Sequence, residues 1–177
     1  MSHVLTLNAG SSTLKFGLFT AEPEPSPKLI GLVDQIGGAA SVKVTDAQGN
    51  TLVSAPLDHD GAADHDGALK VALSQIETQF PDARIVAAGH RVVHGGIQYA
   101  DPVVLTPKVI SELETLQPFA PLHQPHNLAG VRAALAAFPQ AHQVACFDTA
   151  FHRQHSFIND TYALPREYYD KGVRRYG

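Results

Sequence analysis

Residues 5–15 read Leu5-Thr6-Leu7-Asn8-Ala9-Gly10-Ser11-Ser12-Thr13-Leu14-Lys15, and the apolar stretch Phe16-Gly17-Leu18-Phe19 follows at once. An apolar run that stops at polar residues and then resumes predicts two buried strands, over 4–7 and 14–19, joined by a hairpin turn. Gly10 allows the backbone to approach a ligand closely. The N–H groups of the three hydroxyl residues after it can form a concave anion site. The segment therefore predicts a turn that is lined with hydrogen-bond donors.

Five side chains of this turn are candidates for binding a phosphate and its metal ion. Ser11, Ser12 and Thr13 offer hydroxyls, and Lys15 offers a positive charge for phosphate oxygens. Asn8 offers a neutral oxygen, which suits Mg²⁺ or a water bound to it. An ordinary polar hairpin turn has the same composition, so these residues alone leave both interpretations open.

Length and composition limit the classes of protein. The 177 residues suit one domain, or one domain and the start of another. The net charge of −4, without a basic stripe that carries aromatic residues, argues against nucleic acid as a main partner. We see no signal peptide and no apolar stretch long enough to span a membrane. Cys146 is the only cysteine and has no partner for an intrachain disulfide, so we expect a reducing, cytoplasmic location.

Hydrophobic periodicity and turn signals predict the other elements. Further strands are expected over residues 29–36, 42–45, 51–53, 85–93 and 143–147. Helices are expected over 67–80 and 107–116, and a third is expected to be capped by Asn127 and ended by Pro139. Because strands come first and helices then alternate with strands, we predict an α/β fold with a mixed sheet flanked by helices. Ligands of open α/β sheets gather at the carboxyl ends of the strands, where the Asn8–Lys15 turn, the Arg91–Gly96 segment and Asp148 are all expected.

The segment Gly89-His90-Arg91-Val92-Val93-His94-Gly95-Gly96 is a candidate for binding a small acid. Arg91 is a planar, always-charged fork that can bind a carboxylate or a phosphate through two hydrogen bonds. Val93 lies on the same side of a strand as Arg91, because side chains repeat every second residue. Together they would hold an anionic head and a short alkyl tail. A surface ion pair is the alternative interpretation of Arg91.

Two further segments carry candidate groups. In Phe119-Ala120-Pro121-Leu122-His123-Gln124-Pro125, Leu122 can line the same apolar pocket and His123 can donate to an anionic oxygen. The alternative for His123 is a hydrogen-bonded residue in a rigid loop. Asp148 follows a predicted strand and can bind a metal, orient a nucleophile or accept a proton, but aspartate is also a common helix N-cap.

Histidine pairs at 90 and 94, 123 and 126, and 152 and 155 suggest a zinc site, yet the chain has neither an H-E-x-x-H motif nor a cysteine cluster. A phosphate-binding turn, a carboxylate-binding arginine in a small apolar pocket and an aspartate instead indicate phosphoryl transfer to a small carboxylate. Catalysis of that kind rests on positioning and on neutralising the charge of the transferred group.

At this point the motifs resemble those of the acetate kinase (acetokinase) family, of the acetate and sugar kinase/Hsp70/actin superfamily. The family signature N-x-G-S-S-S-x-K is matched by Asn8, Gly10, Ser11, Ser12 and Lys15, with Thr13 in place of the third serine. The signature G-H-R-V-V-H-G-G is complete at 89–96. The A-P-L-H-N-P loop lies at 120–125 with Gln124 in place of asparagine, F-D-T-A-F-H lies at 147–152, and residues 174–177 begin the R-R-Y-G-F-H-G-T-S-H segment.

The resemblance implies a ribonuclease H-like (actin-like ATPase) domain over residues 1–150, followed by a linker and the start of a second domain over 151–177. It implies the reaction ATP + acetate to ADP + acetyl phosphate by direct in-line transfer, with Mg²⁺ or Mn²⁺. By the matching positions, Arg91 and Asp148 would be catalytic, and Arg91, Val93, Leu122 and His123 would bind acetate. Ser11, Ser12, Thr13 and Lys15 would bind the phosphates of ATP, and Asn8 would contact the metal.

Members of that family are about twice as long as this chain and form homodimers, so the chain resembles an N-terminal half that we expect to be inactive alone. Three alternatives stay open. The first is a propionate or butyrate kinase, because one methylene changes binding only modestly. The second is an inert fragment that binds a carboxylate or a phosphate, and the third is a zinc hydrolase.

Overall fold

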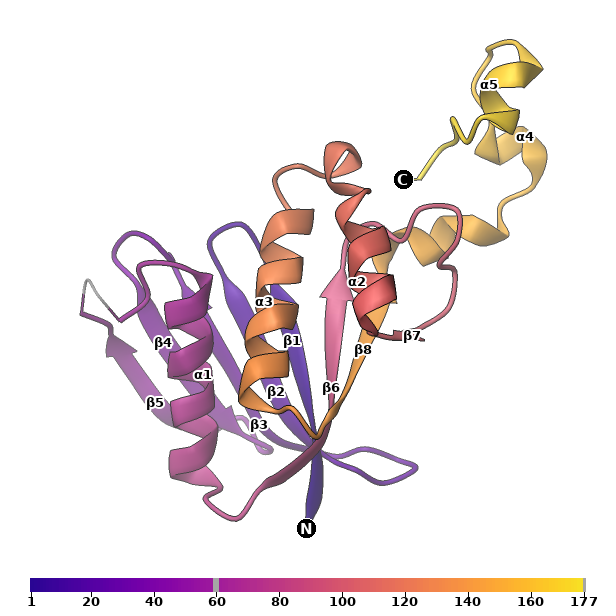
Figure 1. Ribbon diagram of the computed structural model, residues 1–177. Coiled ribbons are helices and arrows are strands. Elements are labelled where there is room, and N and C mark those ends of the chain that lie inside the picture. Colours follow the sequence, from indigo (N-terminus) through magenta and orange to yellow (C-terminus); the bar gives the residue numbers. More distant parts are fainter. Residues whose placement is uncertain (59–60, 177) are drawn as a thin grey trace.

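The computed structural model describes residues 1–58 and 61–176. Within these ranges eight strands form one sheet in the order β5-β4-β3-β2-β1-β6-β8-β7 (Figure 1). The strands are β1 (Ser2–Ala9), β2 (Leu14–Thr20), β3 (Pro27–Asp34), β4 (Ser41–Asp46), β5 (Thr51–Pro56), β6 (Arg84–Val92), β7 (Val103–Val104) and β8 (His142–Phe147). The helices are α1 (His65–Gln79), α2 (Pro107–Glu114), α3 (Gln124–Ala137), α4 (Phe157–Asp160) and α5 (Arg166–Asp170), with short 3-10 turns η1 (Gln117–Phe119) and η2 (Asp148–Gln154).

The sheet is mixed, as the sequence predicts. Strands β1 to β5 pair antiparallel with one another, β1, β6 and β8 run parallel, and β7 is antiparallel to β8. The register places Leu7 beside His90 and Arg91 beside Cys146. The carboxyl ends of these three parallel strands therefore lie at the same end of the sheet, which we call the carboxyl edge. The three candidate segments meet there.

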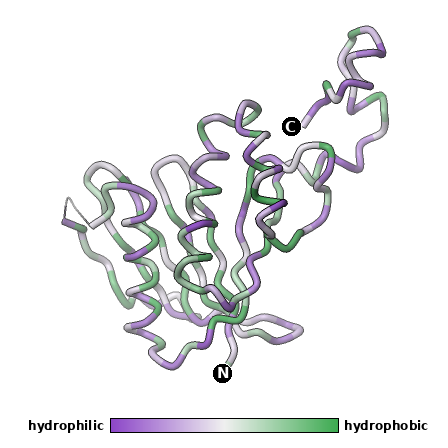
Figure 2. Tube along the Cα trace, in the orientation of Figure 1, coloured by the Kyte–Doolittle hydropathy of each residue, from purple (hydrophilic) through white to green (hydrophobic). Residues whose placement is uncertain are grey.

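Helices α1, α2 and α3 lie against one face of the sheet (Figure 1). Asp64 is the N-cap of helix α1, and its carboxylate accepts a hydrogen bond from the N–H of Gly67. The helix buries Ala68, Leu69, Ala72 and Ile76 at helical spacing. One apolar cluster joins α1 to strands β1–β4, and a second joins α2 and α3 to β6 and β8. Figure 2 shows the apolar residues concentrated along the strands and the helix faces that meet them. Within the described ranges, no helix covers the opposite face of the sheet (Figure 1).

The predicted start of the third helix is wrong. Helix α3 begins at Gln124, with Pro125 in its first turn, and not at Asn127. Asn127 lies inside the first turn, is 3% exposed and turns its amide towards the sheet. Its side chain makes long-range bonds to two strand ends, so tertiary contacts and not capping determine its place.

The chain beyond β8 leaves the sheet at the carboxyl edge and folds back on itself (Figure 1). The buried carboxylate of Asp160 holds this segment, because it accepts hydrogen bonds from Arg153 at 2.8 Å and from Arg174 at 3.5 Å. The division into a domain over 1–150 and a second one over 151–177 stays a prediction, and Gly177, the last residue of the final motif, lies outside the described residues. Among the described helices, none has both the length and the apolar composition that crossing a bilayer requires.

Candidate active site

The turn between β1 and β2 closes on itself. Gly10 donates its N–H to the carbonyl of Thr13 at 2.8 Å, and Ser12 accepts a hydrogen bond from the N–H of Ile36 at 2.9 Å. A side chain at Gly10 would place its Cβ 2.7 Å from Thr13 Oγ1, so the Thr13 side chain would have to move. The side chains of Ser11 and Ser12 are exposed, which leaves their hydroxyls accessible to a ligand.

Arg91 joins the three segments at the carboxyl edge. Its Nε donates to Asp148 Oδ1 at 3.0 Å and to Oδ2 at 2.9 Å, and its Nη2 donates to Oδ2 at 2.5 Å. Its Nη1 donates to Asn8 Oδ1 at 3.2 Å. Residues separated by 57 and 83 positions in the sequence therefore meet at one guanidinium group. Its remaining N–H groups have no hydrogen-bond partner among the described residues, so they are available to an anionic ligand.

Asp148 is an ion-pair partner and caps no helix. Its carboxylate raises the pKa of Arg91, first through hydrogen bonds and less through charge, while partial burial opposes the rise. The side chains of Arg91 and Asp148 are each 42% exposed, so the pair adds little stability. The ion pair expected as the alternative for Arg91 is thus present, and its partner is the other candidate catalytic residue.

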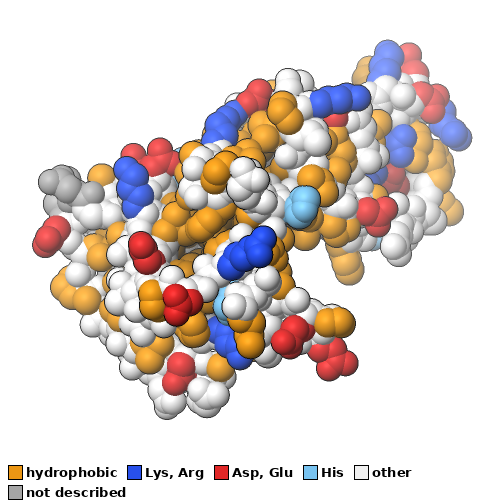
Figure 3. All heavy atoms as spheres, turned by 60° about the horizontal axis from the view of Figure 1, so that its bottom comes forward, with side chains coloured by type: hydrophobic (Ala, Val, Ile, Leu, Met, Phe, Trp, Pro, Cys, Tyr) orange, Lys and Arg blue, Asp and Glu red, His pale blue; other side chains and the backbone are white. Residues whose placement is uncertain are grey.

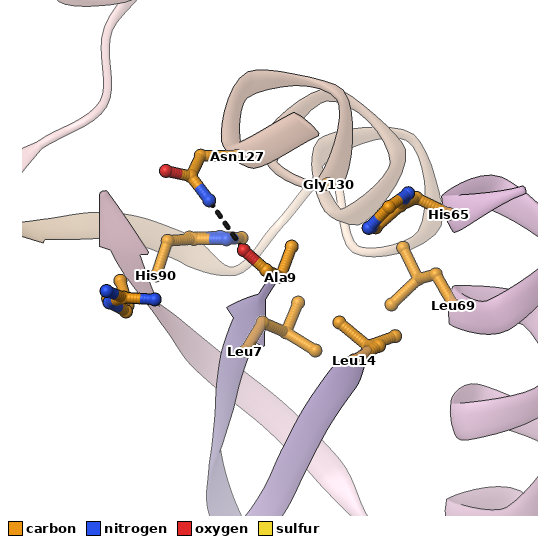
Figure 4. A pocket seen from close by; sticks show the side chains of 9 residues that line it. Leu7, Ala9, Leu14, His65, Leu69, His90, Asn127 and Gly130 are labelled. Atoms are coloured by element: carbon orange, nitrogen blue, oxygen red, sulfur yellow. Dashed lines mark hydrogen bonds between the residues drawn. The ribbon is translucent and has the colours of Figure 1, made fainter. Parts of the chain in front are cut away.

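A hollow of about 360 Å³ lies on the helix-free face of the sheet beside this pair. Asn8, Lys15 and Arg91 line it, with Cys146 and Gly89 from the neighbouring strands. On the helix side, Arg91 also lines a cavity of about 10 Å³ beneath the turn, which Leu7, Ala9, Leu14, His65, Leu69, His90, Asn127 and Gly130 complete (Figure 4). The structure thus gathers Asn8, Lys15, Arg91 and Asp148 at one place.

The other predicted substrate contacts lie outside that hollow. Val93 follows β6 and is half-buried, and Leu122 and His123 lie just before α3 with exposed side chains. None of these three residues is among the described residues that line the hollow. Their roles in binding a methyl group and an anionic oxygen remain predictions.

Two buried amides in the first turn of α3 make contacts that the sequence did not predict. Gln124 is fully buried: it accepts from the N–H of His94 at 3.2 Å and donates to the carbonyls of His94 at 3.0 Å and of Leu113 at 3.2 Å. Asn127 accepts from the N–H of Val93 at 3.1 Å and donates to the carbonyl of Ala9 at 2.8 Å. Pro125 would have indicated the true start of the helix, but no local pattern indicates such long-range bonds.

The histidines have other partners. His90 pairs with Gln143 at 2.7 Å, His94 Nδ1 accepts from the N–H of Gly96 at 3.0 Å, and His65 stacks on His126. Burial lowers the pKa of His90 and of His94. Within residues 1–58 and 61–176 no group of three or more His, Cys, Asp or Glu side chains is placed to hold a metal ion.

A magnesium ion that is bound mainly through phosphate and water fits the oxygen groups that are present. Mg²⁺ keeps most of its waters and takes only one or two protein ligands when it accompanies a nucleotide. Asn8 Oδ1 and the exposed hydroxyls of the turn are ligands of the right type, and Asn8 lies at the hollow that Lys15 and Arg91 also line. Charged groups of both signs are interspersed on the face that Figure 3 shows.

A mixed sheet in this order, with its polar groups at the carboxyl ends of three parallel strands, defines an actin-like ATPase domain of the ribonuclease H-like class. The chain belongs to the acetokinase family, whose sequence model matches residues 3–177.

The acetate kinase of Methylocella silvestris is 49% identical over 182 residues, which cover 98% of this chain and 45% of that protein. The crystal structure of Porphyromonas gingivalis acetate kinase superposes with a TM-score of 0.85 at 36% identity, over 100% of this chain and 45% of that one. A propionate kinase structure from Francisella tularensis superposes with a TM-score of 0.84 at 30% identity, again over 100% and 45%. The chain therefore spans about half the length of the relatives it matches.

Proposed function

We propose that this chain forms the acyl-substrate side of an acetate kinase, which converts ATP and acetate to ADP and acetyl phosphate. The observation that carries the proposal is the meeting of Arg91, Asp148 and Asn8 at the carboxyl edge, next to the hydroxyl-lined turn. A guanidinium group with unused N–H groups suits a carboxylate, and a turn with exposed N–H and hydroxyl groups suits a phosphate.

The reaction needs little covalent chemistry from the protein. An acetate oxygen attacks the γ-phosphorus of ATP in line, the bond to the β,γ-bridging oxygen breaks, and ADP leaves with that electron pair. Arg91 holds the carboxylate and neutralises charge that develops on the transferred group. Asp148 orients Arg91 through its two-oxygen contact, and Val93, Leu122 and His123 complete the acetate pocket.

The turn between β1 and β2 provides the groups that bind phosphate and the metal ion. Ser11, Ser12, Thr13 and Lys15 bind phosphate oxygens, and Asn8 binds Mg²⁺ or one of its waters. When bound, the ion would neutralise phosphate charge. Because the chain spans about half of its relatives, catalysis requires the other half, and we expect a cytoplasmic homodimer for the whole protein.

The direct test joins residues 1–177 to the remaining part of the Methylocella silvestris acetate kinase, in place of the portion they match. Acyl phosphate formed from ATP, Mg²⁺ and acetate is trapped with hydroxylamine. We expect activity in the hybrid, none in the 177-residue chain alone, and loss of at least about 100-fold with Asp148→Asn in the hybrid. Near-normal turnover by the Asp148→Asn hybrid would remove that residue from its role, and turnover by the chain alone would show that the second half is dispensable.

Propionate is the second candidate substrate, because a propionate kinase superposes on this chain nearly as well as an acetate kinase does. One methylene in an apolar pocket changes binding by about 1–3 kcal/mol. The ratio of kcat/KM for acetate to that for propionate in the same hybrid decides between them, and a ratio below one assigns the chain to propionate.

A further inference from the structure

Side chains of two helices form hydrogen bonds with two consecutive carbonyl groups of the hydroxyl-lined turn, from the helix-covered side of the sheet. Asn127 of α3 donates its Nδ2 to the carbonyl of Ala9 at 2.8 Å, a contact that Figure 4 shows. His65 of α1 lies 2.6 Å from the carbonyl of Gly10 through Nε2, and because a carbonyl only accepts, this nitrogen carries the proton. Both helices lie on the helix-covered face of the sheet, whereas the side chains of Ser11 and Ser12 are exposed.

Holding a carbonyl also aims the next N–H group. A trans peptide is planar, so its C=O and N–H point in opposite directions. The carbonyl of Ala9 shares a peptide plane with the N–H of Gly10, which bonds to Thr13 across the turn. The carbonyl of Gly10 shares a plane with the N–H of Ser11. The bond from His65 therefore turns the N–H of Ser11 away from α1.

Asn127 also connects the two halves of the site. Its Oδ1 accepts from the N–H of Val93 at 3.1 Å, while its Nδ2 holds Ala9. Val93 is two residues from Arg91, and Ala9 is next to Asn8. One amide, 3% exposed, thus fixes the end of β6 against the end of β1. In-line transfer depends on the distance between those two ends, because reacting groups that are misplaced by 1 Å lose much of their rate.

We propose that Asn127 and His65 are positioning residues: His65 aims the Ser11 N–H at the phosphate, and Asn127 sets the phosphate-binding turn at a fixed distance from the Arg91 strand. The proposal rests on the proposed function, because it assigns the turn to phosphate. Neither side chain lies on the hydroxyl face of the turn, so both act through the backbone. A purely structural role would lower stability without a selective effect on anion binding.

His65 and His126 provide a matched pair of variants, because their rings stack 4.6 Å apart at 24°. Phenylalanine at either position keeps an aromatic ring in the stack, but only His65→Phe loses the bond to Gly10. We would titrate the 177-residue chain with inorganic phosphate and follow the Ser11 amide by NMR. Loss of one hydrogen bond predicts about fivefold weaker binding in His65→Phe and less than about twofold change in His126→Phe. Equal affinities in the two variants would overturn the role of His65.

Asn127→Asp keeps the size and the acceptor oxygen but removes the donor to Ala9. We expect phosphate affinity to fall about tenfold in the native background and by no more than about twofold when Lys15→Ala has already removed the main phosphate contact. Equal losses in the two backgrounds would indicate a structural role only and overturn the proposal. Val131→Ala, a packing change in the same helix, controls for lost stability, since Val131 is fully buried in the second apolar cluster.

A failure of the proposed function gives a different result. If the unmodified chain binds no phosphate, the assignment of the turn is wrong, and hydrogen exchange of the Gly10 N–H then decides the positioning claim. Faster exchange in His65→Phe and Asn127→Asp, but not in His126→Phe, would support the positioning roles of His65 and Asn127. Unchanged exchange in all three variants would overturn them.

Discussion

Gln124 is a fully buried polar residue whose three hydrogen bonds all reach the backbone. It joins α3 to the segment that follows β6 and to the end of α2. The acetate kinase family, by resemblance, has an asparagine at this position, so the longer side chain is a departure of this chain. Its role is to satisfy the N–H and carbonyl groups of His94, a residue that is buried.

Gln124→Leu should therefore lower the free energy of unfolding by about 2–4 kcal/mol, because it leaves the buried N–H and carbonyl groups of His94 without their partner. Urea unfolding followed by circular dichroism measures the loss. Gln140→Leu is the control: Gln140 is exposed, and its replacement should change stability by less than about 0.5 kcal/mol. Equal effects of the two substitutions would show that the Gln124 amide contributes nothing.

Buried histidines make stability depend on pH. Burial lowers the folded-state pKa of His90 and His94 below their ordinary value of 6.5, so the unfolded chain takes up protons first as pH falls. The stabilisation is complete above pH 6.5 and is lost as pH falls towards the folded-state values. We expect the free energy of unfolding to drop between pH 7.5 and pH 5, and to drop less in His90→Gln. A His142→Gln control, at an exposed position, should keep the full dependence; equal dependence in both variants would contradict this cause.

At the scale of elements, Gly31 shows how β2 and β3 fit together. The ring of Phe16 covers Gly31 so closely that an added Cβ would lie 2.1 Å from the ring carbon Cζ. Gly31↔Phe16 is also a register pair of the two strands. A large residue on one strand thus packs over a missing side chain on the next, which fixes the register of the pair.

Gly31→Ala should cost about 1–3 kcal/mol of stability, since the Phe16 ring has to move. Gly89→Ala is the matched control, because nothing lies within 4 Å of its Cβ position. Chemical denaturation of both variants gives the comparison. A Gly31→Ala protein as stable as Gly89→Ala would mean that the ring moves at no cost.

The sequence predicts those elements whose signals are local. The β1–β2 and β4–β5 hairpins, α1 and α2 are confirmed to within a few residues, because their turns, caps and apolar spacing lie within each segment. The two-residue strand β7 is too short to give a pattern. The predicted start of α3 is wrong because asparagine is a residue type that often caps helices, whereas Asn127 makes the contacts of a core residue.

At the scale of the whole molecule, the site depends on strand order. Strand β6 lies beside β1 although they are separated by more than seventy residues in sequence, and β8 then lies beside β6. This parallel arrangement brings Asn8, Arg91 and Asp148 together. Motifs identified these three residues as candidates, but only the fold shows that Asn8 and Asp148 both bind the guanidinium group of Arg91. His65 lies in no motif, and the motif that contains Gln124 does not indicate its contacts, since both side chains bond to backbone groups far away in the chain.

Arg91, at this edge of the sheet, is proposed to hold the carboxylate of a small acid. The most direct measurement is a titration of the 177-residue chain with acetate, followed by NMR of the Arg91 Nε–H and the Val93 amide. We predict saturable shifts of both signals that chloride at equal ionic strength does not produce, and loss of the Val93 shift in Arg91→Ala, which has no Nε–H. Acetate shifts that are absent, or that persist with the same affinity in Arg91→Ala, would contradict the claim.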